Sequence, residues 1–199
     1  MTLPAGAEDA SFAGEELVDE ELEGATFVRC SFRGARLENL VTRRCSFHGC
    51  DFTLARLNGS EHEGSDFANA IFESSYLFGA RFAECRLVGA SFAGATLTGL
   101  TVEGGDWSYC SLRGQELAGA DLRGLKLREA DLSEANLAGA DLRGAELTRA
   151  VVRNANLADA DLREASLDGV DLAAALHRGV RLDLAGAVQL ARSHGAVVD

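Results

Sequence analysis

The sequence is poor in positive charge. Its 199 residues include 31 Asp and Glu against 19 Lys and Arg, which gives a formal net charge of −12, and Lys126 is the only lysine. Binding to nucleic acid depends on clustered basic side chains that contact phosphates, and anionic membrane surfaces attract the same groups. The composition therefore argues against a protein that binds nucleic acid or a membrane surface.

Long apolar segments are also missing. No run of residues approaches the length of a membrane span, and the amino-terminal stretch MTLPAGAEDASF contains neither the basic nor the apolar region of a secretion signal. The five cysteines are an odd number, which suits a reducing compartment better than a framework of disulfides. We therefore expect a cytoplasmic protein.

Recognisable catalytic motifs are absent as well. The sequence has no nucleophile elbow, no Walker loop and no HExxH pattern. We expect no enzyme activity, no cofactor and no metal site.

What the sequence does contain is a five-residue repeat, clearest in Ala120–Leu147, ADLRGLKLREADLSEANLAGADLRGAEL. A period of five fits neither the spacing typical of a helix nor the alternation typical of a strand. From Phe12 to Leu182 every fifth residue is a repeat centre, and all but three of the 35 centres are apolar. The residue two positions before the centre is Ala, Cys, Ser or Gly in 27 repeats. Paired large and small inward residues of this kind favour a narrow solenoid.

A longer period of twenty residues indicates the number of sides. The segment ADLR begins at Ala120 and recurs at steps of twenty, and five phenylalanines have the same spacing: Phe12, Phe32, Phe52, Phe72 and Phe92. Four five-residue sides per coil explain both spacings and place these rings in one column. At a strand spacing of about 4.8 Å, about nine coils give a rod roughly 40 Å long. We expect a lead-in at 1–9, an all-β solenoid at 10–182, and a capping and dimerisation helix with a tail at 183–199.

The tail is expected to cover the open end of the solenoid. Asp183 fits an N-cap, and His194 followed by Gly195 fits the end, of a short helix with an apolar face. A helix that covers one end can equally cover a second copy, which predicts a two-fold homodimer. The residues assigned to the dimer interface are Leu184, Ala187, Val188, Leu190 and Ala191. Residues 196–198, AVV, are expected to add a short edge strand.

The A(D/N)Lxx register resembles that of the pentapeptide-repeat proteins over about residues 10–182. The resemblance implies a right-handed quadrilateral β-helix. The acidity, the phenylalanine-rich first half, the leucine-rich second half and the ending RLDLAGAVQLARSHG are similar to the Mfp-type members and, more broadly, to the Qnr-type members. This narrower resemblance implies binding to DNA gyrase, quinolone resistance and, in the Mfp type, a dimer formed by the carboxy-terminal helix. The projecting loops of the Qnr type have no counterpart in this unbroken register.

Cysteine and histidine provide the few candidate reactive sites. Cys45 and Cys50 resemble a metal site, and Cys30 lies one coil from Cys50, where the spacing would allow a disulfide. All five cysteines nevertheless occupy the small inward position, which favours buried free thiols that act as small apolar residues. Thr42 and His62 replace apolar centres on adjacent coils. We interpret them as a dent with satisfied polar groups, and a functional site is the alternative.

The acidic residues are the strongest candidates for a binding surface. Their simplest explanation is a solvated surface that keeps the rod soluble. The alternative is mimicry of duplex DNA, since a dimer of charge −24, twice −12, would have about half the charge density of B-DNA. We assign the partner surface to carboxylates near the expected dimer centre: Asp121, Asp131, Asp141, Asp159, Asp161, Asp168 and Asp171. Three of these have an arginine two residues away that partly neutralises them.

Three aromatic residues lie outside the core register: Tyr76, Phe78 and Tyr109. Isolated surface aromatics are the simpler interpretation. The alternative is a patch that docks a partner protein.

The leading hypothesis is a non-enzymatic homodimer that binds DNA gyrase, or topoisomerase IV, in place of DNA and so protects it from quinolone-like poisons or modulates its response. One alternative is a structural or scaffolding rod without a topoisomerase role. Another is a self-immunity protein in a producer of a gyrase-targeting antibiotic. The expected partners are gyrase and a second copy of the chain, with no nucleic acid and no membrane.

Overall fold

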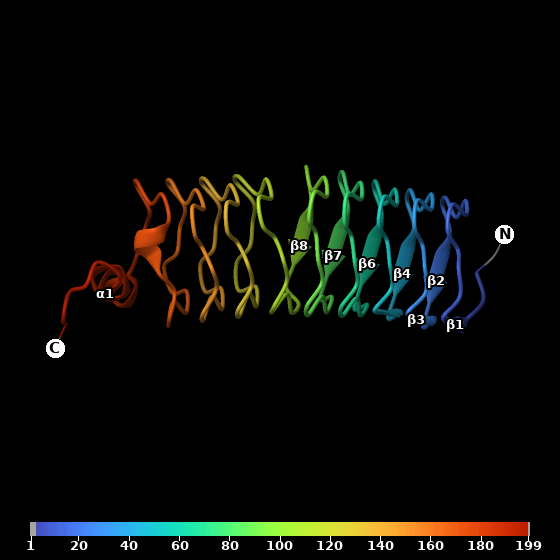
Figure 1. The fold of residues 1–199 in the computed structure, drawn as a ribbon, viewed down its shortest axis with the longest axis horizontal. Helices are drawn as coiled ribbons and strands as arrows, with labels where there is room; N and C mark the ends of the chain where they lie inside the picture. Colours follow the sequence, from blue (N-terminus) through green and yellow to red (C-terminus); the bar gives the residue numbers. More distant parts are fainter. Residues whose placement is uncertain (1–2, 199) are drawn as a thin grey trace.

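The chain forms a parallel β-solenoid with one short helix at its carboxy-terminal end (Figure 1). The structure is a computed structural model and describes residues 3–198. Parallel bridges join residues twenty positions apart, from Ser11 with Ser31 to Asp161 with Arg181, so each coil has four sides, as predicted. We number the sides by their first repeat centre, and every twentieth residue after it belongs to the same side: Phe12 for side 1, Leu17 for side 2, Leu22 for side 3 and Phe27 for side 4.

Strands of three residues form on two of the four sides. Side 4 contains β1 (Gly6–Glu8), β3 (Thr26–Val28) and β5 (Ser46–His48). Side 3 contains β2 (Glu21–Glu23), β4 (Val41–Arg43), β6 (Glu61–Glu63), β7 (Arg81–Ala83) and β8 (Thr101–Glu103). The remaining contacts between coils are single parallel bridges. The strands are short because a corner must turn the chain within every five-residue repeat.

The first strand corrects the expected lead-in. Ala7 of β1 pairs with Phe27 of β3, so the solenoid already includes residues 6–8 of the segment 1–9 that the sequence placed outside it. Ala7 continues the column of centres on side 4, but its small side chain hides the repeat. Residues 1 and 2 lie outside the described part of the chain.

Phenylalanine rings stack along the first half of the rod. On side 1 the centroids of consecutive rings from Phe12 to Phe92 are 4.9–5.0 Å apart, and Trp107 lies 5.4 Å from Phe92. A second stack begins at Phe27 on side 4. In the second half, leucine and alanine fill the same inward positions and are buried. The predicted phenylalanine column and the change of core residues are confirmed.

The helix α1 (Leu184–Ser193) follows the last coil, in which the short 3-10 helix η1 (Leu172–Ala174) interrupts the bridges. Asp183 caps α1 by accepting a hydrogen bond from the Gly186 N–H at 2.9 Å. Its other carboxylate oxygen accepts one from the Glu164 N–H at 2.8 Å, which ties the helix to the rod. The predicted cap and helix are confirmed. The edge strand predicted at 196–198 is wrong, because this segment runs beyond α1 and away from the coils (Figure 1).

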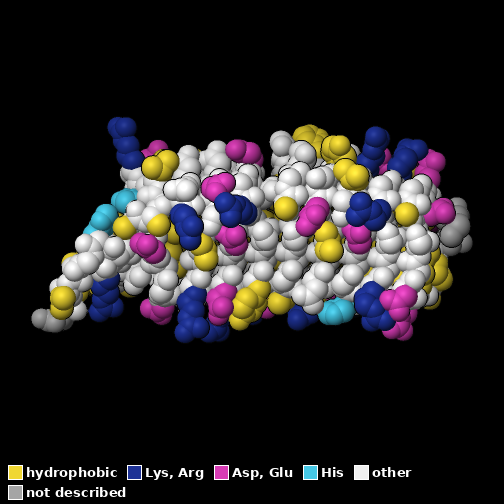
Figure 2. Space-filling view, viewed as in Figure 1, with side chains coloured by type: hydrophobic (Ala, Val, Ile, Leu, Met, Phe, Trp, Pro, Cys, Tyr) yellow, Lys and Arg dark blue, Asp and Glu magenta, His cyan; other side chains and the backbone are white. Residues whose placement is uncertain are grey.

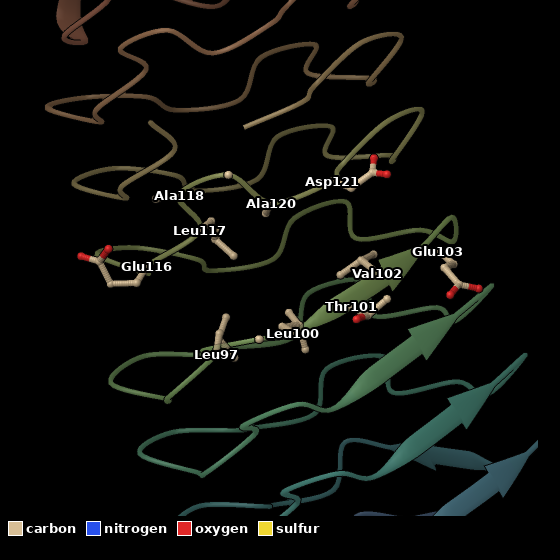
Figure 3. Close-up of a pocket in the computed structure, with 12 residues that line it drawn as sticks. Leu97, Leu100, Thr101, Val102, Glu103, Glu116, Leu117, Ala118, Ala120 and Asp121 are labelled. Carbon is tan, nitrogen blue, oxygen red and sulfur yellow. The ribbon is translucent and has the colours of Figure 1, made fainter. Parts of the chain in front are cut away.

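The ladder opens just after β8. Within residues 3–198, no bridge joins Thr96 to Glu116 on side 2 or Thr101 to Asp121 on side 3, although both pairs are twenty residues apart. Sides 1 and 4 remain paired at the same height. A cleft of about 440 Å³ therefore separates these stretches of chain on two sides (Figure 3). The unbroken register of the sequence did not predict this opening.

Candidate protein-binding surface

The most regular charged surface is a ladder of Asp and Arg on side 3. Asp121, Asp141 and Asp161 each accept hydrogen bonds of 2.6–2.9 Å from the Nε and Nη2 groups of the arginine two residues later. These hydrogen bonds lower the pKa of all three carboxyl groups, that of Asp161 to about 2. The carboxylates are therefore ionised, but the adjacent arginines cancel much of their charge, as expected from the sequence.

The other four predicted partner-binding carboxylates have no basic partner within 4.0 Å in the described part of the chain: Asp131, Asp159, Asp168 and Asp171. They surround the rod instead of sharing one surface. Asp131 and Asp171 lie on side 1, Asp168 lies on side 4, and Asp159 occupies the corner between sides 2 and 3. One partner surface on a single protomer can therefore contact only some of them.

The acidic amino-terminal end is neutralised by the next coil. Arg29 contacts Glu8 and Asp9, each at 2.7 Å. Three more pairs cross the same boundary: Glu16 with Arg36, Glu21 with Arg43, and Glu23 with Arg44. Such exposed pairs add little stability, but they cancel charge. Figure 2 shows the result on one face, where both signs of charge alternate along the rod.

The three predicted docking aromatics do not form one patch. Tyr76 and Phe78, 46% and 60% exposed, both project from side 2. Tyr109 lies in the following coil at the corner between sides 4 and 1, and its hydroxyl donates a hydrogen bond to Glu129 at 3.5 Å. Tyr76 and Phe78 remain together as a candidate contact pair.

The predicted dimer-interface residues divide between two faces of α1. Leu184, which is 82% exposed, Ala187, Val188 and Ala191 recur at helical spacing on one face. Leu190 instead packs against the core of its own rod. The inner face also uses Gly186, because a side chain there would collide with the underlying leucines. The outer face thus leaves apolar surface available to a second copy.

The buried polar pair Thr42 and His62 is fully satisfied. His62 Nδ1 lies 2.8 Å from the Thr42 hydroxyl, and its Nε2 lies 3.0 Å from the Ser60 hydroxyl. Burial lowers the pKa of His62 to about 3, so the ring is neutral. The structure confirms the interpretation of a dent with satisfied polar groups.

The five cysteines are free and buried, as predicted. Burial raises the pKa of Cys50 and Cys110 to about 12 and that of Cys85 to about 11, which leaves little reactive thiolate. Within residues 3–198 no group of three His, Cys, Asp or Glu side chains is placed to hold a metal ion. In the same range, no helix has the length and apolar character needed to cross a bilayer.

The cleft after β8 is the feature that sequence reasoning missed. A signal was present, because Leu100 and Gln115 stand at inward positions where small residues are the rule. Leu40 and Leu125 occupy equivalent positions and are fully buried, so a large residue alone does not open the ladder.

A solenoid of this kind defines the pentapeptide-repeat family, and the chain belongs to it. The family model of pentapeptide repeats matches residues 21–59, 75–106, 101–133 and 135–173. The pentapeptide repeat protein MfpA of Mycobacterium tuberculosis (strain ATCC 25618 / H37Rv) is 38% identical over 76 residues. That alignment covers 38% of this chain and only 39% of the relative.

Solved structures extend the similarity over nearly the whole chain. QnrB1, a plasmid-mediated fluoroquinolone resistance protein, has a TM-score of 0.83 and 26% identity, with 98% of both chains covered. HetL, which is involved in heterocyst differentiation regulation in the cyanobacterium Nostoc sp. strain PCC 7120, has a TM-score of 0.53 and 25% identity. Its alignment covers 88% of this chain and 84% of HetL.

Proposed function

We propose that this protein binds DNA gyrase, or topoisomerase IV, in place of duplex DNA and protects the enzyme from quinolone-like poisons or modulates its response to them. The observation that carries the proposal is the similarity to QnrB1, a fluoroquinolone resistance protein, over 98% of both chains. The match to MfpA and the net charge of −12 on an elongated solenoid support the same reading.

The proposed mechanism is electrostatic binding without catalysis. The carboxylates without arginine partners, Asp131, Asp159, Asp168 and Asp171, enter the basic groove that normally receives DNA. The Asp and Arg ladder contributes less, because its charge is already compensated within the protomer. Long-range attraction of this kind steers association and weakens as salt is added.

A homodimer formed through the outer face of α1 completes the proposal. It places two copies of these carboxylates around one centre and doubles the charge presented to the enzyme. Sedimentation of the full chain beside the Leu184→Asp variant tests this step. We expect a dimer and a monomer, respectively, with weaker gyrase binding by the monomer. A monomeric full chain would remove the dimer from the mechanism.

A matched pair of charge variants tests the mimicry. The first replaces Asp131, Asp159, Asp168 and Asp171 with Asn. The control replaces four exposed acids of the first half that also lack an ion pair in the described chain, Glu61, Glu63, Glu73 and Glu84, with Gln. Both variants lose four negative charges, so a non-specific effect of net charge is the same in each.

We expect the first variant to bind host gyrase at least about tenfold more weakly at low salt, and the control less than about threefold. Supercoiling should be measured with and without a quinolone. The proposal fails if the two variants behave alike, or if the unmodified protein leaves supercoiling unchanged in both conditions.

A scaffolding rod is the second candidate. Extensive pairing between acids and arginines on the surface favours it, because a compensated surface is a weak imitation of DNA. HetL also shows that a similar solenoid is linked to a different process. This function predicts that both charge variants keep partner binding, whereas replacement of Tyr76 and Phe78 with Ser removes it.

A further inference from the structure

The cleft after β8 exposes backbone groups that are paired in neighbouring coils. In a closed coil the N–H of a repeat centre donates to the carbonyl that precedes the next centre of the same side, as Phe72 does to Ser91 at 2.7 Å. Within residues 3–198 the N–H groups of Leu97 and Val102 make no such bond, and the N–H of Asp121 makes none to the coil before it. Both walls of the cleft are therefore strand edges with free donors and acceptors.

The floor of the cleft reaches the apolar core. Ala95, Leu100 and Ala120 are only half-buried, whereas most small inward residues elsewhere are fully buried. Val102 is also half-buried, although Phe82 directly beneath it on side 3 is completely buried. The opening thus joins unpaired backbone to apolar side chains (Figure 3).

Gln115 holds the two coils apart. Its side chain is buried, and Nε2 donates a hydrogen bond to the Phe92 carbonyl, 23 residues earlier, at 2.7 Å. Cys110 occupies the equivalent inward position one repeat before and donates its thiol to the Leu87 carbonyl, also 23 residues earlier, at 2.8 Å. The cysteine makes this contact with a short side chain, and its coils remain paired. The longer glutamine side chain makes the same contact across a wider gap.

The chemistry of the walls selects the occupant. Alternating donors and acceptors along a strand edge are completed by another extended backbone. The apolar floor suits a small aliphatic side chain. The cleft is also lined by Glu103, Glu116 and Asp121, with no Lys or Arg among its lining residues. Glu103 and Asp121 pair with arginines outside the lining, whereas Glu116 accepts a hydrogen bond only from the neutral Asn136 amide within the described chain.

We propose that this cleft binds an extended segment of a partner protein, in which small aliphatic residues alternate with polar residues between flanking basic ones. The segment adds as a strand beside β8. Its aliphatic side chains enter the core and its basic side chains lie near the acids of the cleft, because successive strand residues point to opposite faces. The proposal is independent of gyrase binding, since it uses neither the four unpaired aspartates nor the dimer.

Binding of a labelled probe peptide, acetyl-Arg-Val-Thr-Val-Arg-amide, to the full chain tests the proposal. Two control peptides separate the contributions: one carries N-methyl groups on both valine nitrogens, and the other replaces both arginines with glutamate. We expect each control to bind at least about tenfold more weakly, because the first loses backbone donors and the second loses charge complementarity.

Two variants show where the peptide binds. Gln115→Cys shortens the side chain to the length that Cys110 has, so we expect the cleft to close and peptide binding to disappear. Leu40→Cys makes a similar reduction at an inward position in a paired coil, and we expect unchanged binding. Circular dichroism of both variants verifies the fold.

Amide hydrogen exchange makes the result decisive even if one variant folds poorly. The N–H groups of Leu97 and Val102 should exchange rapidly in the free protein and slowly with the probe peptide bound. The proposal is overturned if the N-methylated peptide binds as well as the probe, if no peptide binds while these amides exchange rapidly, or if the amides are already protected in the free protein.

Discussion

The two halves of the rod use one repeat with different side chains inside it. The first half stacks aromatic rings, contains all eight strands and includes the polar dent at Thr42 and His62. The second half is filled with leucine and alanine, joins its coils by single bridges, and carries the Asp and Arg ladder outside. The cleft lies where the two meet. The comparison teaches that a solenoid tolerates a change of core because each coil contacts only its neighbours, and that the mismatch is confined to one junction.

The junction also limits how the halves share stability. Two of the four sides stay paired across it, whereas all four are paired between coils such as those joined by β4 and β6. We therefore expect the halves to unfold as partly separate units.

Truncation of one stacked ring should have the largest effect. Phe52 is buried, with neighbouring rings 5.0 Å away on both sides. Phe52→Ala should cost about 3–5 kcal/mol of unfolding free energy, mainly in the first half, and Leu142→Ala about 2–5 kcal/mol, mainly in the second. Hydrogen exchange followed by mass spectrometry resolves the halves. Equal loss of protection in both halves for either variant would show a single cooperative unit.

Acid should weaken the first half before the second. Burial lowers the pKa of His62 from its ordinary 6.5 to about 3, so below pH 6.5 the unfolded chain takes up a proton that the folded chain does not. The free energy of unfolding should therefore fall by about 1.4 kcal/mol per pH unit, or about 2 kcal/mol at pH 5. Denaturant unfolding between pH 7.5 and pH 5 measures the slope.

His62→Phe is the control for this pH dependence. The ring continues the column with Phe82, and the variant should lose most of the slope whatever its own stability at pH 7.5. The exposed histidines are the same in both proteins and cancel in the comparison. An unchanged slope would mean that His62 does not titrate on unfolding.

Surface charge should matter least to stability in either half. Arg29→Gln removes two exposed ion pairs in the first half, and Arg143→Gln breaks the ladder in the second. Each should change the unfolding free energy by less than about 1 kcal/mol, with a smaller change at high salt. A loss of several kcal/mol in thermal or denaturant unfolding would show that these pairs stabilise the rod.

The sequence predicted the parts of the molecule that follow the repeat. Phenylalanines twenty residues apart could only stack if each coil had four sides, and Asp183 fitted an N-cap on composition alone. The inward packing of Leu190 depends on how α1 meets the last coil, which no local pattern encodes. The cleft was missed because Gln115 keeps the register intact and acts only through the reach of its side chain.

The candidate acidic surface was predictable only in part. An arginine two residues after Asp121 could be seen in the sequence, so its compensation was expected. The pairing of Arg29 with Glu8 and Asp9 joins different coils and depends on side-chain conformation. The positions of the unpaired aspartates follow from the twenty-residue period, but the surface they present together depends on a second copy of the chain.

The buried thiols give the rod a built-in reporter of where it opens. Four of them, Cys30, Cys45, Cys50 and Cys85, lie in the first half, and Cys110 lies at the junction. An alkylating reagent can reach each thiol only while its own coil is exposed. The order in which the five are trapped therefore records whether disassembly proceeds from the amino-terminal end inward or begins at the centre of the rod.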